Sequence, residues 1–228
     1  MTIHSKPYCI IPARGGSKRI PQKNIKPFLG KPLIAYSILC AKNIGAEVIV
    51  STDSEEIARI AEKWGANVPF LREKALSDDF TPTLDVIQDA ILHLEISHTS
   101  LVIALYPTAP LLNPQILQKA LECKDEKSLY VFSATEFDSS PFRGFSYENQ
   151  TLKMLYNEHI NTRSQDLPKL YHDAGQFYIG LAESFVQKKP IFSPQSTPYI
   201  LPSMYVQDID TLEDFKLAEL KYRVIYEN

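Results

Sequence analysis

The chain has 228 residues, of which 44% are hydrophobic and 22% charged, and its formal net charge is −3. This length suffices for one substantial domain with a continuous core, and the composition is that of an ordered globular protein. An acidic chain is not built to coat nucleic acid or an anionic membrane surface. We therefore expect a single domain over residues 1–228 that has neither a nucleic-acid nor a membrane partner.

The cysteine pattern indicates a reducing compartment. The three cysteines, Cys9, Cys40 and Cys123, are far apart in the sequence and odd in number, which disfavours a disulfide framework. The N-terminus lacks the apolar stretch of a signal peptide, and no apolar run approaches the ~20 residues that span a bilayer. We expect a cytoplasmic protein whose cysteines behave as small buried hydrophobic residues.

Short apolar runs alternate with helical patterns through the first 135 residues. Strands are expected at 8–13, 47–52, 100–107 and 128–135. Helices are expected at 32–45, 53–65, 83–95 and 113–124, where polar caps, an early proline or a closing glycine mark most of the ends. The alternation predicts an α/β fold with a mostly parallel sheet covered on both faces.

The sequence changes character from about Phe137 to Asp173, where it becomes polar, aromatic and rich in turns. The stretch ENQT at 148–151 suits a hairpin turn, so residues 137–173 are expected to form an inserted β-hairpin arm. A lone hairpin is barely stable in water and needs a surface to pack against. After the arm we expect a strand and a short helix within 175–185, a strand at 204–207 and a final helix within 207–227.

A basic, glycine-containing loop, PARGGSKRIPQKN, follows the first expected strand. Ligands of open α/β sheets bind where loops leave the carboxyl ends of strands. Gly15 and Gly16 allow backbone amides to approach an anion, and the side chains of Arg14, Lys18, Arg19 and Lys23 supply positive charge. The loop is neither a Walker A motif nor a dinucleotide fingerprint. Although a solvated basic loop is the alternative, the coincidence of glycines, charge and position favours phosphate binding.

Asp208 and Asp210 lie two residues apart in the segment QDIDTLEDF. In an extended segment, residues two apart project to one side, so both carboxylates can face one hard cation. Mg²⁺ takes one or two carboxylates and leaves its other positions to water and phosphate. The alternative is that Asp210 or Thr211 caps the last helix, and both roles are compatible. We expect Mg²⁺ as the cofactor.

These motifs resemble those of the CMP-nonulosonate synthetases, the cytidylyltransferases that activate sialic-acid-like sugars. The similar segments are residues 11–38, 50–66, 70–87, 105–112, 163–180 and 208–215, in the order in which the family has them. The resemblance thus covers almost the whole chain. It implies a three-layer, Rossmann-like nucleotidyltransferase fold in which the β-hairpin arm dimerises the protein. It also implies CTP and a nonulosonic acid as substrates of a homodimer.

The resemblance also implies roles for individual residues. Nucleotide binding falls to Ala13, Arg14, Gly15, Gly16, Ser17, Asn24, Arg72, Asp79, Thr81 and Thr83, although helix capping by Thr83 is an alternative. Catalytic roles fall to Arg14, Lys23, Asp208 and Asp210, the last two as Mg²⁺ ligands. The sugar site would comprise Arg19, Tyr106, Gln176, Phe177 and, from the partner subunit of the dimer, Arg163.

Departures from the family pattern concern the sugar. Arg19 stands where sialate enzymes usually have glycine, Tyr106 where they tend to have glutamine, and AGQFY at 174–178 where they have an NGAxY element. These differences favour the branch that activates pseudaminic acid, with legionaminate and sialate as alternatives.

The resemblance implies in-line attack of the anomeric hydroxyl on the α-phosphate of CTP, and no Ser, Cys or His arrangement indicates a covalent nucleophile. A glycosyltransferase that uses a sugar nucleotide and a non-catalytic nucleotide-binding domain are more remote alternatives. The glycosyltransferase would not need the basic loop after the first strand.

Overall fold

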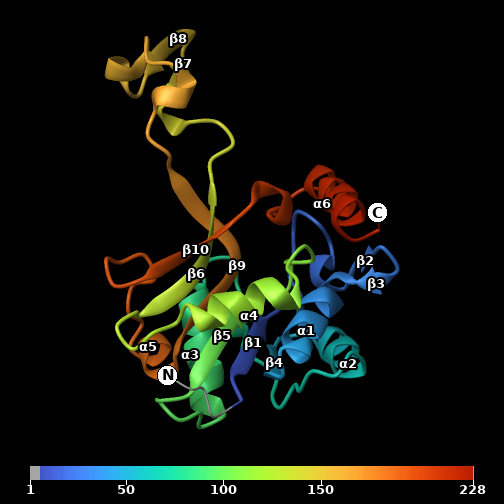
Figure 1. The fold of residues 1–228 in the computed structure, drawn as a ribbon. Coiled ribbons are helices and arrows are strands. Elements are labelled where there is room, and N and C mark those ends of the chain that lie inside the picture. Colours follow the sequence, from blue (N-terminus) through green and yellow to red (C-terminus); the bar gives the residue numbers. More distant parts are fainter. Residues whose placement is uncertain (1–5, 228) are drawn as a thin grey trace.

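The computed structural model describes residues 6–227 and is built on a six-stranded sheet of order β10-β6-β9-β5-β1-β4 (Figure 1). Its strands are β1 (Tyr8–Pro12), β4 (Glu47–Ser51), β5 (Leu101–Leu105), β6 (Tyr130–Glu136), β9 (Tyr171–Leu181) and β10 (Thr197–Leu201). β9 is antiparallel to β5 and β6, while the other neighbours are parallel. The predicted mostly parallel sheet is confirmed.

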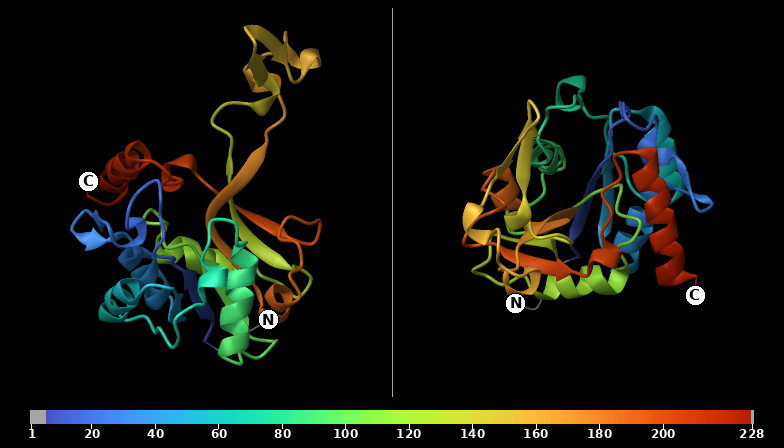
Figure 2. Two further views of the ribbon diagram at one scale, coloured as in Figure 1. Left: turned by 180° about the vertical axis from the view of Figure 1, so that it is seen from behind. Right: turned by 90° about the horizontal axis from the view of Figure 1, so that it is seen from above.

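Helices cover both faces of the sheet, which confirms the three-layer prediction (Figures 1 and 2). The helices α1 (Leu33–Asn43), α2 (Glu55–Lys63) and α4 (Pro114–Glu122) share one core with Ile11 and Ile103, and the helices α3 (Thr83–His93) and α5 (Ala182–Val186) share the other with Ile10 and Val102. Successive residues of a strand face opposite sides, so β1 and β5 contribute to both cores. None of the helices among residues 6–227 is both long and apolar enough to cross a membrane.

The predicted helix ends are largely those of the structure. The Ser54 hydroxyl accepts a hydrogen bond from the Ile57 amide at 3.4 Å, and the Asn113 side chain accepts one from the Ile116 amide at 2.8 Å. Pro82 is the N-cap residue of α3 and makes no side-chain hydrogen bond to the helix, so Thr83 does not cap it.

The last helix, α6 (Leu212–Tyr226), begins with a capping box in which Thr211 and Asp214 bind each other's backbone. It packs beside a small hairpin of β2 (Pro27–Phe28) and β3 (Lys31–Pro32), with the Phe28 and Phe215 rings 5.5 Å apart.

Two expectations from the sequence are wrong. Residues 204–207 form no strand, because a 3₁₀ turn at Ser203–Tyr205 occupies the segment. The strand of this region is β10, which the sequence analysis missed because most of its side chains are exposed and no apolar run marks it. An edge position also tolerates Pro198. Cys9 and Cys40 are buried as expected, but Cys123 is exposed.

The hairpin arm is confirmed as an insertion between β6 and β9 that projects away from the sheet (Figure 1). Its strands are β7 (Phe145–Glu148) and β8 (Thr151–Met154). They are joined by Asn149 and Gln150, whose φ angles of 49° and 60° match a type I′ hairpin turn. Below the hairpin, the ring of Phe142 packs against His159, with the ring centroids 4.7 Å apart.

Gly180 offers a test of packing at the centre of the sheet. A Cβ atom added there would lie 2.8 Å from Cδ1 of Tyr130, which is fully buried. We expect Gly180→Ala to lower the free energy of unfolding by about 1–3 kcal/mol through overpacking, measured in urea. Gly16→Ala is the control, because nothing lies within 4 Å of its added Cβ. Equal unfolding midpoints for Gly180→Ala and the wild type would contradict the prediction.

Candidate functional site

The predicted functional loops meet at the carboxyl-end edge of the parallel strands, as the topology requires. Two pockets lie there. The first has a volume of about 270 Å³ and is lined in part by the basic loop and by the segment before α3. It includes Arg14, Ser17, Lys18, Arg19, Lys23, Asn24, Arg72, Asp79, Thr81, Thr83 and Tyr106.

The basic loop is shaped by side chains from neighbouring elements. Asp53, two residues beyond the end of β4, accepts a hydrogen bond from the Gly15 amide at 2.8 Å. The Asn24 amide donates to the Arg14 carbonyl at 3.0 Å, and the fully buried Ala13 donates its N–H to the Ser51 carbonyl at 2.9 Å. Ala13, Gly15 and Gly16 are not among the residues that line the first pocket. The amides of Ala13 and Gly15 therefore hold the loop in this structure.

Asp79 neutralises the two cations at the start of the loop. Its carboxylate lies 2.7 Å from the Arg14 guanidinium and 2.5 Å from the Lys18 ammonium. Hydrogen bonds from Lys18 and then Arg14 hold the pKa of Asp79 below its usual value, so the carboxylate stays ionised. A phosphate group that binds Arg14 therefore has to compete with Asp79.

Arg72 is the buried cation of the first pocket, with only 5% of its surface exposed. Its guanidinium donates to the Ser51 carbonyl at 3.2 Å and to the Ser77 hydroxyl at 3.0 Å. Burial lowers the pKa of Arg72, whereas the charge of Asp53 acts in the opposite direction. These contacts hold the guanidinium in place, so it offers an anion or a base a fixed planar donor.

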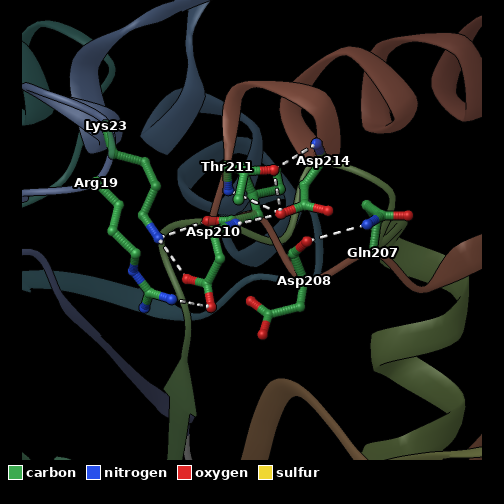
Figure 3. A network of polar contacts seen from close by, with 8 residues as sticks. Arg19, Lys23, Gln207, Asp208, Asp210, Thr211 and Asp214 are labelled. Carbon is green, nitrogen blue, oxygen red and sulfur yellow. Dashed lines mark hydrogen bonds and ion pairs between the residues drawn. The ribbon is translucent and has the colours of Figure 1, made fainter. Parts of the chain in front are cut away.

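The predicted carboxylate pair lies beside the basic loop (Figure 3). Asp210 is 2.7 Å from the Arg19 guanidinium and 3.6 Å from the Lys23 ammonium, which also donates to the Ile209 carbonyl at 2.6 Å. Burial raises the pKa of Asp208, and the charge of Asp210 raises it further. The two carboxylates are thus close enough to repel each other.

Two carboxylates in this position could hold a Mg²⁺ ion whose remaining ligands come from water or a phosphate. Among residues 6–227, no group of three or more His, Cys, Asp and Glu side chains could hold a metal. Two carboxylates alone suit Mg²⁺, which retains water and takes phosphate oxygens as further ligands. Asp214 supports the pair, because its carboxylate accepts hydrogen bonds from the Asp210 amide at 3.1 Å and the Thr211 amide at 2.7 Å.

The second pocket, of about 440 Å³, adjoins the first and shares Tyr106 and Thr108 with it. Its other lining residues are Thr135, Glu136, Asp138, His172, Asp173, Ala174, Gly175, Ser203, Val206, Gln207, Asp208 and Lys221. The Tyr106 hydroxyl lies 2.9 Å from the Thr83 hydroxyl, so its ring is fixed between the two pockets. The arrangement can hold two ligands side by side, with Asp208 at the second.

The structure separates the residues that were predicted for the sugar. Tyr106 lines both pockets, while Arg19 lines only the first. Phe177, which was predicted to contact the sugar, is fully buried in the core and lines neither pocket. Gln176 is also buried, and its amide donates to the Tyr205 carbonyl at 2.6 Å, which supports the segment before Asp208. Arg163 lies on the arm, exposed, and lines neither pocket.

Two residues at the site were missed by the sequence analysis. Asp53 lies two residues beyond the end of a buried strand, so its position was a signal that could have identified it. Lys221 lies in the middle of α6, and the sequence does not identify it as a site residue. A helical pattern does not show which of its side chains pack near a distant loop.

Comparisons with known proteins agree with this geometry. A family model described as cytidylyltransferase matches residues 8–225. The chain is 48% identical to a pseudaminic acid cytidylyltransferase of Campylobacter jejuni, over 98% of this chain and 99% of the relative. It is 32% identical to a CMP-N,N'-diacetyllegionaminic acid synthase of Legionella pneumophila, over 92% and 93%. A solved CMP:2-keto-3-deoxy-manno-octonic acid synthetase, complexed with CTP, has a similar fold (TM-score 0.71, 16% identity, 98% of this chain and 100% of that chain).

Proposed function

Since the chain belongs to the cytidylyltransferase family, we propose that it joins CTP and pseudaminic acid to give CMP-pseudaminic acid and diphosphate. The observation that carries the proposal is the pair of adjoining pockets that share Tyr106 and Thr108. The first pocket, with its basic loop, suits a triphosphate, and the second suits the sugar acid. The substrate follows from the 48% identity, which spans nearly the full length of both chains.

The reaction needs charge and alignment more than a protein nucleophile. The anomeric oxygen of the sugar attacks the α-phosphorus, and the bond from that phosphorus to the leaving diphosphate breaks. Arg14, Lys18 and Lys23 would stabilise the negative charge that builds up on the phosphate oxygens. Arg14 and Lys18 become available when Asp79 gives way to the triphosphate.

Asp208 and Asp210 would hold Mg²⁺, which when bound supplies positive charge to the phosphate oxygens and acidifies the attacking hydroxyl. Arg19 and Lys23 line the first pocket, and their ion pairs with Asp210 hold its carboxylate beside them. The Lys23 ammonium also binds the Ile209 carbonyl, which ties the segment of the two aspartates to the basic loop.

The active form would be a cytoplasmic homodimer, since the cysteines are free and the arm is suited to pairing. Its tip exposes the large apolar side chains Phe145, Tyr147, Leu152, Leu155 and Ile160. Apolar surface on a projecting arm is stabilised when a second subunit covers it. From such a partner, Arg163 would reach the neighbouring sugar site.

The test is to incubate the protein with CTP, Mg²⁺ and pseudaminate, legionaminate or N-acetylneuraminate in parallel, and to measure diphosphate release. We expect pseudaminate to give the highest kcat/KM. A preference for legionaminate or N-acetylneuraminate would assign the chain to another branch of the family. CTP binding without diphosphate release from any sugar acid would favour a non-catalytic nucleotide-binding protein.

A further inference from the structure

The second pocket is acidic, although its proposed ligand is an anion. Its lining includes the four carboxylates of Glu136, Asp138, Asp173 and Asp208. Among its described lining residues, Lys221 is the only lysine or arginine. A sugar acid that enters this pocket brings a further negative charge, which like charges repel. A cation among the lining residues offsets this repulsion.

Two of the four carboxylates already have partners that offset their charge. Glu136 forms an ion pair with Lys169 at 3.0 Å. Asp173 accepts hydrogen bonds from the Tyr178 hydroxyl at 2.5 Å and from the Gly175 amide at 2.9 Å. Asp208 is proposed to bind the metal, which leaves Asp138. Burial lowers the pKa of Lys221, and the negative charge of Asp138 acts in the opposite direction.

Lys221 is held in place by backbone carbonyl groups and not by a carboxylate. Its ammonium donates to the Val206 carbonyl at 2.7 Å and to the Ser203 carbonyl at 3.3 Å. An ammonium has three N–H donors, so these contacts leave a third for a ligand. Because the two carbonyls hold the ammonium in one place, little side-chain entropy is lost when a ligand binds.

We propose that Lys221 binds the carboxylate of the sugar acid from within the same subunit. The proposal rests on the proposed function, because it assigns a residue to the second substrate. In a nonulosonic acid the carboxylate and the anomeric hydroxyl are attached to the same carbon. A carboxylate bound at Lys221 therefore holds the attacking oxygen in the pocket that Asp208 also lines. Lys221 thus selects 2-keto sugar acids over neutral sugars.

The test compares Lys221→Met with Lys221→Arg, and uses Lys216→Met, an exposed lysine of the same helix, as the matched control. We expect Lys221→Met to raise the KM for pseudaminate and weaken its equilibrium binding by about 10- to 100-fold, the range for a lost charge-assisted hydrogen bond. The KM for CTP and the Mg²⁺ concentration at half-maximal rate should stay the same. Lys221→Arg should restore part of the affinity, and Lys216→Met should behave as the wild type.

Unchanged pseudaminate binding in Lys221→Met would overturn the proposal. So would a shift in Mg²⁺ dependence without a shift in pseudaminate affinity, because Lys221 would then only support the segment that carries Asp208. If the methionine variant does not fold, Lys221→Gln retains an N–H donor for the Val206 carbonyl without the charge, and the same outcomes apply.

Binding of pseudaminate measured without CTP separates this proposal from the proposed function. The proposed function fails if the wild type releases no diphosphate from CTP with any of the sugar acids. The Lys221 proposal fails if wild type and Lys221→Met bind pseudaminate equally. No binding of pseudaminate to the wild type in this assay overturns the Lys221 proposal, whereas diphosphate release alone decides the proposed function.

Discussion

Replacing Asp210 by asparagine is expected to lower Mg²⁺-dependent diphosphate release by about 10²- to 10³-fold while the protein stays folded. The carboxylate pairs with Arg19 and Lys23 and lies beside Asp208, so asparagine removes the negative charge at the centre of the cluster. The fold should persist because Asp214 binds the Asp210 backbone amide and not its side chain. Initial rates across a Mg²⁺ titration, together with a urea unfolding curve, measure both effects.

The control for this substitution is Glu213→Gln, which removes an exposed carboxylate three residues away. It should keep the wild-type rate and the wild-type Mg²⁺ dependence. If Asp210→Asn retains normal turnover, the assignment of the metal to the pair of Asp208 and Asp210 is wrong. The Asp210→Asn variant should also lose the ion pair between Asp210 and Arg19.

Arg14→Met is expected to lower kcat/KM for CTP by about 10²- to 10³-fold. The guanidinium lines the first pocket, where it donates to the Asp78 carbonyl and pairs with Asp79, both at 2.7 Å. A triphosphate that displaces Asp79 would accept hydrogen bonds from the same guanidinium. These hydrogen bonds would be stronger in the transition state, where negative charge builds up on the phosphate oxygens. Steady-state rates at varied CTP and saturating pseudaminate give the value.

Arg59→Met is the matched control, because Arg59 is exposed on α2 and does not line either pocket. Arg14→Lys should recover only part of the lost activity, since an ammonium cannot reproduce the two parallel hydrogen bonds of a guanidinium. A wild-type kcat/KM for CTP in Arg14→Met would place the triphosphate elsewhere.

Local pattern was enough for much of the architecture. The runs that became β1, β4, β5 and β6 are largely buried on both faces, and such strands are mostly hydrophobic in sequence. The sequence did not predict β10, because it is an exposed edge strand without an apolar run. Its backbone pairing with β6 is what holds it in the sheet. The basic loop was located from its position after a strand. That position is informative because parallel strands end at one edge of the sheet, where ligands bind.

The sequence by itself determined the alternating elements, the hairpin arm, the basic loop and the pair of Asp208 and Asp210, because each depends on neighbours in the chain. The tertiary structure alone decided which side chains reach the pockets. It buried Phe177 in the core and brought Lys221 from α6 to the second pocket. Those placements depend on where distant elements pack, which no local spacing records.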